Sequence, residues 1–358
     1  MTTPAGGVLV VLAALAICGP AAAQGPLPVA VDTVVAIDHT ADADVPDTTG
    51  VLFDAVASVG LGRGFEGFVR PIAQRLDRGT TAEWNRQVWI ATLRYQRPGN
   101  VGLRVDAGLI PSPLGLANLM LRPHLNPTIA LPSALSAALP LAGAPRTTLL
   151  GFIYGYGVSA TVSGTRWDAR AAVIDASPVR PRRIFAEAGQ NPPRFGTVVV
   201  GGGVTPFVGV RVGASVTSSG WQRAGESPGM TADRDVTVVT LESQVEFRHT
   251  KLQGEWVRDS FETATGRQNA SGGWVQAQQT LTPRWFAAAR IEQIAAPQVS
   301  PLGATVNLRL TSVEETVGFR LTPELTFRIG HRARRTFNAP TYDNQVLMSA
   351  VWWKRWRQ

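Results

Sequence analysis

The sequence has 358 residues, of which 44% are hydrophobic and 17% charged, and a formal net charge of +8. Lys251 and Lys354 are its only lysines, so the positive charge comes almost wholly from arginine. Such a charge can indicate nucleic-acid binding, but the chain has no basic tract and no aromatic RNA motif, which argues against that class. After the N-terminus no segment offers the roughly 18 uncharged apolar residues of a transmembrane helix.

The N-terminus predicts export. Residues 8–18 (VLVVLAALAIC) form an apolar run too short to span a bilayer, and Ala21-Ala22-Ala23 matches a small-residue cleavage site. We therefore expect a signal peptide over residues 1–23, although no Lys or Arg precedes the apolar run. Its removal takes away Cys18, the only cysteine, so residues 24–358 have neither a disulfide framework nor a thiol nucleophile.

The rest of the chain consists of short alternating segments separated by turn residues, which predicts β-strands. In residues 207–217, for example, Val208, Val210 and Val212 share a face opposite Gly209 and Arg211. We predict sixteen strands, over residues 29–38, 51–61, 64–74, 84–96, 100–110, 149–163, 166–176, 195–204, 207–217, 236–248, 251–262, 272–281, 284–294, 311–321, 324–334 and 345–355.

The connections between these strands alternate between short and long. Long connections are expected at residues 177–194, 218–235, 263–271 and 335–344. Tight periplasmic turns and longer outer loops are typical of up-and-down outer-membrane barrels, and sixteen strands with both termini periplasmic require seven tight turns. We assign the seven to residues 61–64, 97–100, 163–165, 205–206, 249–250, 282–283 and 322–323.

A soluble sandwich shows the same alternation, so a large periplasmic β protein is the alternative. Two observations favour the membrane barrel. One face of strand after strand consists of Gly, Ser, Thr, Gln, Arg and Glu, which suits a water-filled lumen. Aromatic residues also lie at the strand ends beside the tight turns. In the predicted strand at residues 149–163, Tyr154 and Tyr156 share the apolar face and are expected to point outward. The aromatic girdle is predicted from Phe65, Tyr95, Trp167, Phe207, Phe247, Trp285 and Phe319.

The connection after the strand at 100–110 is unusual. Residues 111–145 contain seven prolines and almost no charge, and residues 114–121 and 133–139 could each hold a helical turn. As the third outer loop, this segment is predicted to fold into the lumen and narrow it. The alternative is an apolar loop packed on the rim or on a neighbouring subunit. The predicted constriction residues are Pro113, Arg122, His124 and Asn126.

The stretch RVDAGLIPSPLGL (104–116), followed by RPHLNP (122–127), resembles phosphate-selective and related general porins. In that family a strand ends in a Gly-aromatic-x-x-Pro-Phe-Gly-Leu-like phrase, after which the chain turns inward. Here Leu114 stands where an aromatic residue is common, and the last strand ends in Arg357-Gln358 rather than an aromatic. The resemblance implies an outer-membrane barrel and a possible homotrimer, but not a preference for phosphate.

Arginines recur on the face predicted to line the lumen, where charged rings set ion preference. A mild anion preference follows if the arginines are in excess, whereas lumen carboxylates such as Glu242, Glu255, Glu292 and Glu314 could neutralise them. The predicted pore-lining residues are Arg70, Arg94, Arg104, Asp106, Arg170, Arg211, Arg290, Arg320, Arg328 and Arg332.

The sequence has no enzymatic motif. The four histidines have no metal-like spacing, and no Gly-x-Ser-x-Gly phrase occurs. We therefore expect no cofactor and no metal. The predicted function is a porin-like channel for small solutes or anions, in contact with outer-membrane lipid of a Gram-negative-type bacterium. The alternative is a non-conducting barrel with a structural, adhesive or envelope-complex role.

Overall fold

The computed structural model describes residues 28–42, 47–78, 81–111, 113–141, 146–151, 154–180, 194–227, 230–299 and 305–357. The expected signal peptide (residues 1–23) lies outside these residues. No helix among them has the length and hydropathy needed to cross a bilayer.

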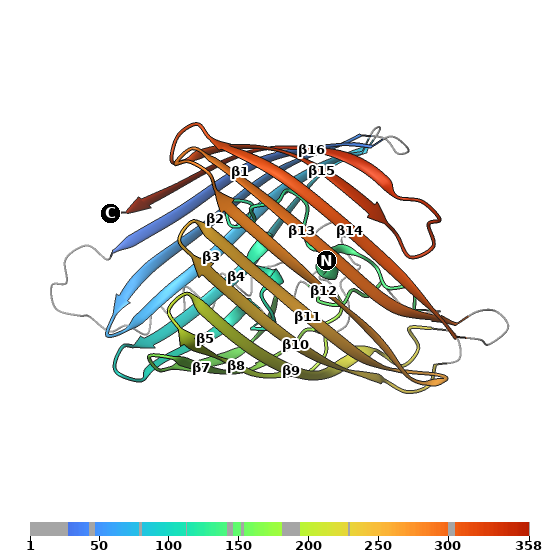
Figure 1. Ribbon diagram of the computed structural model, residues 1–358. Helices are drawn as coiled ribbons and strands as arrows, with labels where there is room; N and C mark the ends of the chain where they lie inside the picture. Colours follow the sequence, from blue (N-terminus) through green and yellow to red (C-terminus); the bar gives the residue numbers. More distant parts are fainter. Residues whose placement is uncertain are drawn as a thin grey trace.

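The chain forms a closed antiparallel β-barrel in which each strand pairs with its neighbours in sequence and β1 closes on β16 (Figure 1). The predicted number and order of strands are therefore confirmed. Closure leaves no sheet edge, so every strand can pair its backbone polar groups on both sides. The strands are β1 Val29–Asp42, β2 Thr48–Gly62, β3 Phe65–Arg78, β4 Thr81–Arg97, β5 Gly102–Pro111, β6 Tyr154–Ser163, β7 Trp167–Ile174, β8 Thr197–Phe207, β9 Val210–Gln222, β10 Arg234–Phe247, β11 Thr250–Thr263, β12 Gly266–Thr280, β13 Trp285–Val299, β14 Thr305–Arg320, β15 Leu325–Arg335 and β16 Asp343–Arg357.

Seven tight connections lie at the barrel end where β1 begins and β16 ends, as expected. The predicted position of one of these turns, residues 205–206, is wrong. Thr205 and Pro206 belong to β8, and the turn is Val208-Gly209. Gly209 has a φ of +85°, and a Cβ there would meet the Glu246 carbonyl oxygen at 2.3 Å, so this position requires glycine. Pro206 is accommodated by a register irregularity between Val204 and Phe207.

The opposite end of the barrel has the longer connections, with two exceptions. One is between β3 and β4, where Arg78 pairs with Thr81. The long loop predicted at residues 263–271 is wrong, because β11 and β12 continue to a short turn and Thr263 pairs with Gly266. The residues of this hairpin are polar on both faces, since they extend beyond the part of the barrel that needs an apolar outer face. Their sequence therefore lacks the alternation from which strands were predicted.

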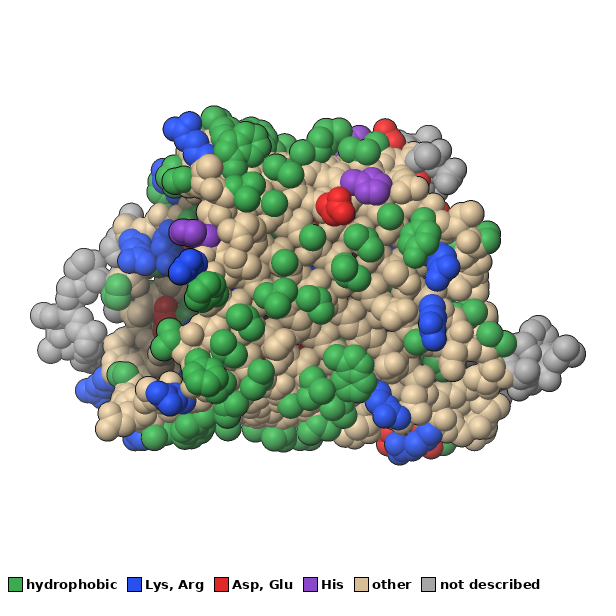
Figure 2. Space-filling view, in the orientation of Figure 1, with side chains coloured by type: hydrophobic (Ala, Val, Ile, Leu, Met, Phe, Trp, Pro, Cys, Tyr) green, Lys and Arg blue, Asp and Glu red, His purple; other side chains and the backbone are tan. Residues whose placement is uncertain are grey.

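The outward face is apolar in its central part (Figure 2). Val200, Ile291 and Ile329 point outward and are 52%, 60% and 55% exposed, as an outer face in contact with hydrocarbon requires. The predicted aromatic girdle is present at the tight-turn end, where the Phe65 and Tyr95 rings lie 5.0 Å apart. Trp285 and Phe319 form a second such pair at 4.7 Å.

The interior is packed with side chains. One apolar cluster of buried residues extends from Ile72 on β3 to Leu310 on β14 and includes much of the segment between β5 and β6. Tyr154 belongs to this cluster, so its predicted outward orientation is wrong. Its hydroxyl accepts a hydrogen bond from Arg70 at 3.2 Å, and its ring lies 4.9 Å from Trp89. These partners hold Tyr154 inside, whereas Tyr156 is 43% exposed on the outer face.

Candidate functional site in the barrel lumen

The third outer connection, between β5 and β6, folds into the lumen. We call its described residues, 113–141 and 146–151, the lumen segment. It contains two short helical turns, the 3-10 helix η1 (Ala117–Leu121) and the helix α2 (Ser133–Ser136), close to the two turns expected from the sequence. Its backbone and side chains contact β2 and every strand from β11 to β16. The segment therefore crosses the barrel from the strands that hold it to the opposite wall.

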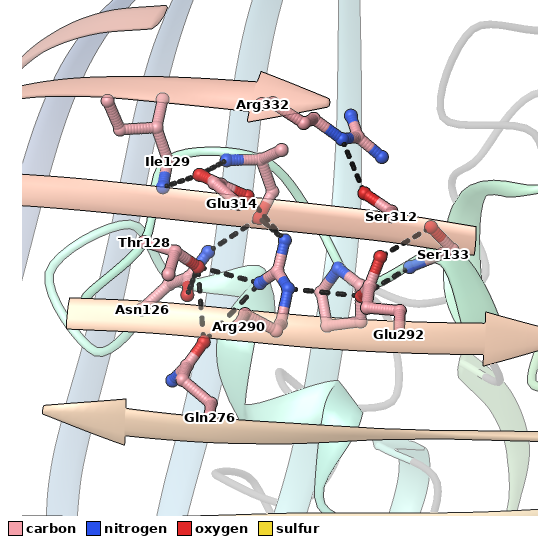
Figure 3. Close-up of polar contacts among 12 residues, drawn as sticks. Asn126, Thr128, Ile129, Ser133, Gln276, Arg290, Glu292, Ser312, Glu314 and Arg332 are labelled. Atoms are coloured by element: carbon pink, nitrogen blue, oxygen red, sulfur yellow. Dashed lines mark hydrogen bonds and ion pairs between the residues drawn. The ribbon is translucent and has the colours of Figure 1, made fainter. Parts of the chain in front are cut away.

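Arg290 on β13 is the centre of the largest polar contact (Figure 3). Its side chain is 1% exposed and forms ion pairs with Glu292 at 3.0 Å and Glu314 at 2.8 Å. It also donates hydrogen bonds to the Thr128 hydroxyl at 2.7 Å and the Ala130 carbonyl at 2.8 Å. The guanidinium therefore joins the barrel wall to the lumen segment through planar, charge-assisted contacts.

The two carboxylates beside Arg290 bind backbone of the lumen segment. Glu314 accepts hydrogen bonds from the Ile129 and Ala130 N–H groups at 2.6 and 3.0 Å. Glu292 accepts from the Ser133 N–H at 2.9 Å and the Ser133 hydroxyl at 2.5 Å (Figure 3). Backbone donors that lie outside regular structure are thereby satisfied in the buried interior.

Arg328 on β15 satisfies acceptors in the same way. Its Nη1 donates to the carbonyls of Pro123, Asn126 and Thr128 at 3.1, 2.5 and 2.9 Å. Its Nη2 donates to the Ser349 hydroxyl at 2.7 Å. This one side chain therefore holds the turn at residues 123–128 in a single conformation.

A third contact lies at β2 and β3. Asp54 is 1% exposed and accepts two hydrogen bonds from Arg70, at 2.9 and 2.8 Å. The Arg122 side chain of the lumen segment approaches the same carboxylate at 3.4 Å. Burial and the nearby Arg70 charge lower the pKa of Arg122.

His124 follows in the lumen segment and stacks on Trp353 of β16, with ring centroids 5.5 Å apart and an angle of 6° between the planes. Burial and the neighbouring Arg122 charge lower the pKa of His124 to about 4. The imidazole is therefore neutral at a pH near 7.

The remaining side of the lumen segment is apolar. Leu114 and Met120 are at most 2% exposed and belong to the same cluster as Val257 and Trp274 of the wall. Gly115 has a φ of +72°, and a Cβ there would meet the Glu255 carboxylate at 1.9 Å. Glu255 also accepts the Ala117 N–H at 2.9 Å. A cavity of about 30 Å³, lined by residues that include Leu125, Pro127, Gln253 and Gln276, has room for about one water molecule.

Nearer the tight turns the lumen is polar and partly exposed. Asp106 pairs with both Arg94, at 2.6 Å, and Arg104, at 3.0 Å. Arg211 pairs with Asp168 at 3.0 Å and with Glu242 at 2.6 Å. Arg170 contacts the same Glu242 at 3.1 Å.

The structure thus places the predicted pore-lining arginines in two kinds of environment. Arg290 and Arg328 donate hydrogen bonds to the lumen segment, and Arg70 donates to Tyr154 at the start of β6. Arg332 donates to Ser312 at 3.1 Å and forms no hydrogen bond or ion pair with the segment among the described residues. Arg320 lies at the tight-turn end, where it donates to the Pro283 carbonyl at 3.3 Å and stacks over Phe286. Of the predicted constriction residues, Arg122, His124 and Asn126 make the contacts above, and Pro113 is half-buried at the start of the segment.

Sequence reasoning missed Asp54, Thr128, Ser133 and Trp353. Of these four, only Asp54 has a local sequence feature that could have marked it as a site residue, because it is a lone carboxylate in an otherwise apolar strand. The residues around Thr128, Ser133 and Trp353 form no pattern that indicates their contacts. Among the residues that the structure describes, no group of three or more His, Cys, Asp or Glu side chains is arranged to hold a metal ion.

No protein-family model and no curated protein matches the sequence. Solved structures share the fold. OmpT, an outer-membrane protein of Vibrio cholerae, is 9% identical and superimposes with a TM-score of 0.59 over 93% of this chain and 99% of its own. OmpF of Salmonella typhi, in complex with daunomycin, is 11% identical, with a TM-score of 0.62 over 92% of this chain and 97% of its own. The chain therefore has the closed β-barrel fold of these outer-membrane proteins, with porin-like architecture.

Proposed function

We propose that this barrel is a passive channel for small solutes, with no catalytic role, and that the lumen segment sets its width. The observation that carries the proposal is the Arg290 contact with Glu292, Glu314 and the lumen segment. A loop that merely covered the mouth would need no charged anchors inside the barrel. A segment held by buried ionic contacts keeps one position, which a size-selective constriction requires.

The partly exposed lumen near the tight turns supports a mild anion preference. Arg94 and Arg104 share the single carboxylate of Asp106, and Glu66, opposite Arg94 in the strand register, forms no ion pair with either among the described residues. Within ion-pair distance, therefore, two guanidinium groups have one carboxylate. By contrast, Arg170 and Arg211 are balanced by Asp168 and Glu242. The preference is therefore small, because most lumen arginines are neutralised within the wall.

A non-conducting barrel is the second candidate, and the apolar packing of the lumen segment favours it. Leu114, Leu135 and Leu150 are fully buried in a cluster that continues into the wall. If this packing closes the lumen, the barrel serves as a structural or adhesive protein of the outer membrane, or as part of an envelope complex.

Single-channel recording of the purified protein in a planar bilayer separates the two candidates. The channel proposal expects discrete conductance steps and, in a salt gradient, a reversal potential on the anion side. Arg104→Gln should move that potential towards zero, because it removes the excess charge at Asp106. Absence of steps in protein whose barrel is intact by circular dichroism contradicts the channel and supports the non-conducting barrel. Size-exclusion chromatography with light scattering tests the trimer that the resemblance implies.

A further inference from the structure

Three arginines point outward near the end of the barrel opposite the tight turns. On β11, Glu255 and Val257 face the interior and Trp256 the exterior, so Arg258 also faces outward. The same alternation places Arg267 of β12 and Arg309 of β14 on the outer face, and all three side chains are exposed. Within the described residues, none of the three has a carboxylate in ion-pair contact, in contrast to lumen arginines such as Arg70, Arg211 and Arg290.

Their height in the membrane follows from strand geometry. Phe319, in the girdle at the tight-turn end, and Arg309 lie on the same outward face of β14, ten residues apart. Ten residues of strand span about 33 Å, which is about 25 Å across the membrane at a tilt near 40°. This equals the height of the apolar band of an outer-membrane barrel. Arg309 therefore lies where the outer-leaflet headgroups begin, and Figure 2 shows basic side chains along that right-hand edge of the hydrophobic surface.

The pairing of the strands places the arginines around one area. Arg258 pairs with Ser271, Ser271 with Ala295, and Ala295 with Arg309, so Arg258 and Arg309 lie on one register row. Three strand spacings separate them by about 14 Å. Arg267 lies four residues beyond Ser271 on β12, about 13 Å farther along the strand.

A groove occupies the surface between these strands. It has a volume of about 470 Å³ and is lined by Arg267, Asn269, Pro297, Asn307 and three further residues. Pro297 of β13 pairs with Asn307 of β14, and Asn269 of β12 lies two residues from Ser271, which pairs with Ala295 of β13. The proline of β13 therefore lies beside longer polar side chains in the lining of the groove. The groove therefore offers amide groups and one guanidinium at the level of the lipid headgroups.

The nearest opposing charge is Glu262, which pairs with Arg267 across β11 and β12. Its carboxylate accepts a hydrogen bond from the Asp235 N–H of β10 at 3.3 Å and is thus directed away from the groove. Arg267 remains available to an external anion.

We propose that Arg258, Arg267, Arg309 and the groove over β13 bind the phosphorylated sugar headgroup of an outer-leaflet lipid. The arginines supply bidentate contacts to phosphate, and the amides of the groove supply hydrogen bonds to sugar hydroxyls. The occupant follows from position, because this outward surface of an outer-membrane barrel meets the outer leaflet. The proposal does not depend on whether the lumen conducts.

Binding of bis-phosphorylated lipid A to the protein in dodecyl maltoside tests the site, measured by microscale thermophoresis at low and high salt. The triple variant Arg258→Gln, Arg267→Gln, Arg309→Gln should bind about 100-fold more weakly at low salt, since each arginine near a lipid phosphate contributes about a fivefold change. Glu262→Gln should bind more tightly than the wild type, because it removes the carboxylate that lies directly opposite Arg267. High salt should weaken wild-type binding.

The matched control replaces three exposed arginines near the tight turns, Arg97, Arg166 and Arg284, with glutamine and should leave binding unchanged. An equal loss in both triple variants would show that net charge alone attracts the lipid, and would overturn the site. Equally tight binding of fully dephosphorylated lipid A would overturn it as well. Circular dichroism confirms folding, and Arg309→Gln alone, with an expected fivefold loss, serves if the triple variant does not fold.

Discussion

Replacement of Arg290 tests whether the lumen segment is held by the ionic contact at β13 and β14. Arg290→Met keeps an extended side chain of similar length but removes the ion pairs to Glu292 and Glu314. It also removes the hydrogen bonds to Thr128 and the Ala130 carbonyl. Two carboxylates are left buried with only backbone and hydroxyl donors from the segment.

The expected cost follows from this loss. Removal of one partner from a buried ion pair costs about 3–5 kcal/mol, and the donors retained by Glu292 and Glu314 place this case near the lower limit, about 3 kcal/mol. Arg332→Met is the matched control. Arg332 is buried on β15, opposite Glu314 in the strand register, and donates to Ser312 at 3.1 Å; within the described residues it forms no ion pair with Glu314 and no hydrogen bond to the lumen segment. Loss of that contact should cost about 1–2 kcal/mol.

Tryptophan fluorescence during urea unfolding in detergent measures both variants, and planar-bilayer recording measures their conductance. Arg290→Met should unfold at lower urea concentration than Arg332→Met, and its conductance should be larger or noisier because the segment is released. Equal stability of the two variants together with wild-type conductance in Arg290→Met would refute the anchoring role of this contact.

Three further predictions address the segment and the lipid face. Because burial lowers the pKa of His124 to about 4 from an unfolded value of 6.5, the unfolded chain binds the additional proton first as pH falls. The free energy of unfolding should be at its full value above pH 6.5 and decrease by about 2 kcal/mol towards pH 4, after allowance for solvent screening by partial exposure. His124→Gln should flatten the plot of urea midpoint against pH in this range. An unchanged slope of that plot would contradict the assignment. Glu315 is exposed on the outward face in the apolar band and pairs across strands with His331, so Glu315→Val should raise barrel stability in lipid vesicles by about 1–2 kcal/mol, whereas a decrease would show that the carboxylate has a partner on that face. In protein without Cys18, a cysteine at position 119, where Leu119 is 55% exposed, should react rapidly with a charged maleimide and one at the fully buried Leu114 slowly; similar rates would mean that the segment is not docked.

The number, order and outward faces of the strands could be predicted because they depend on local features. Alternation repeats every two residues, and glycine and polar turn residues mark the tight connections. Where these signals were weak, the predictions failed. Polar residues on both faces hid the hairpin at 263–271, and Pro206 seemed a better turn than Val208-Gly209 because a proline within a paired strand is uncommon.

The lumen segment could be recognised as unusual, but its contacts could not be read from the sequence. Arg290 and Glu292 share a face by simple alternation, yet their meeting with Thr128 and Ser133 joins residues about 160 positions apart in the chain. Strand register also places Glu314 opposite Arg290. Register depends on closure of the whole barrel, which no local pattern specifies.

By itself, therefore, the sequence determined a sixteen-stranded barrel with an apolar exterior and a proline-rich third outer connection. Only the tertiary structure decided how the arginines are used. In sequence they form one population on the polar faces. In the closed barrel most of those inside have carboxylates or backbone carbonyls as partners, because unpaired charge in a buried interior is costly. Those outside, at Arg258, Arg267 and Arg309, remain unpaired within the described chain, because there the surroundings can supply the anion.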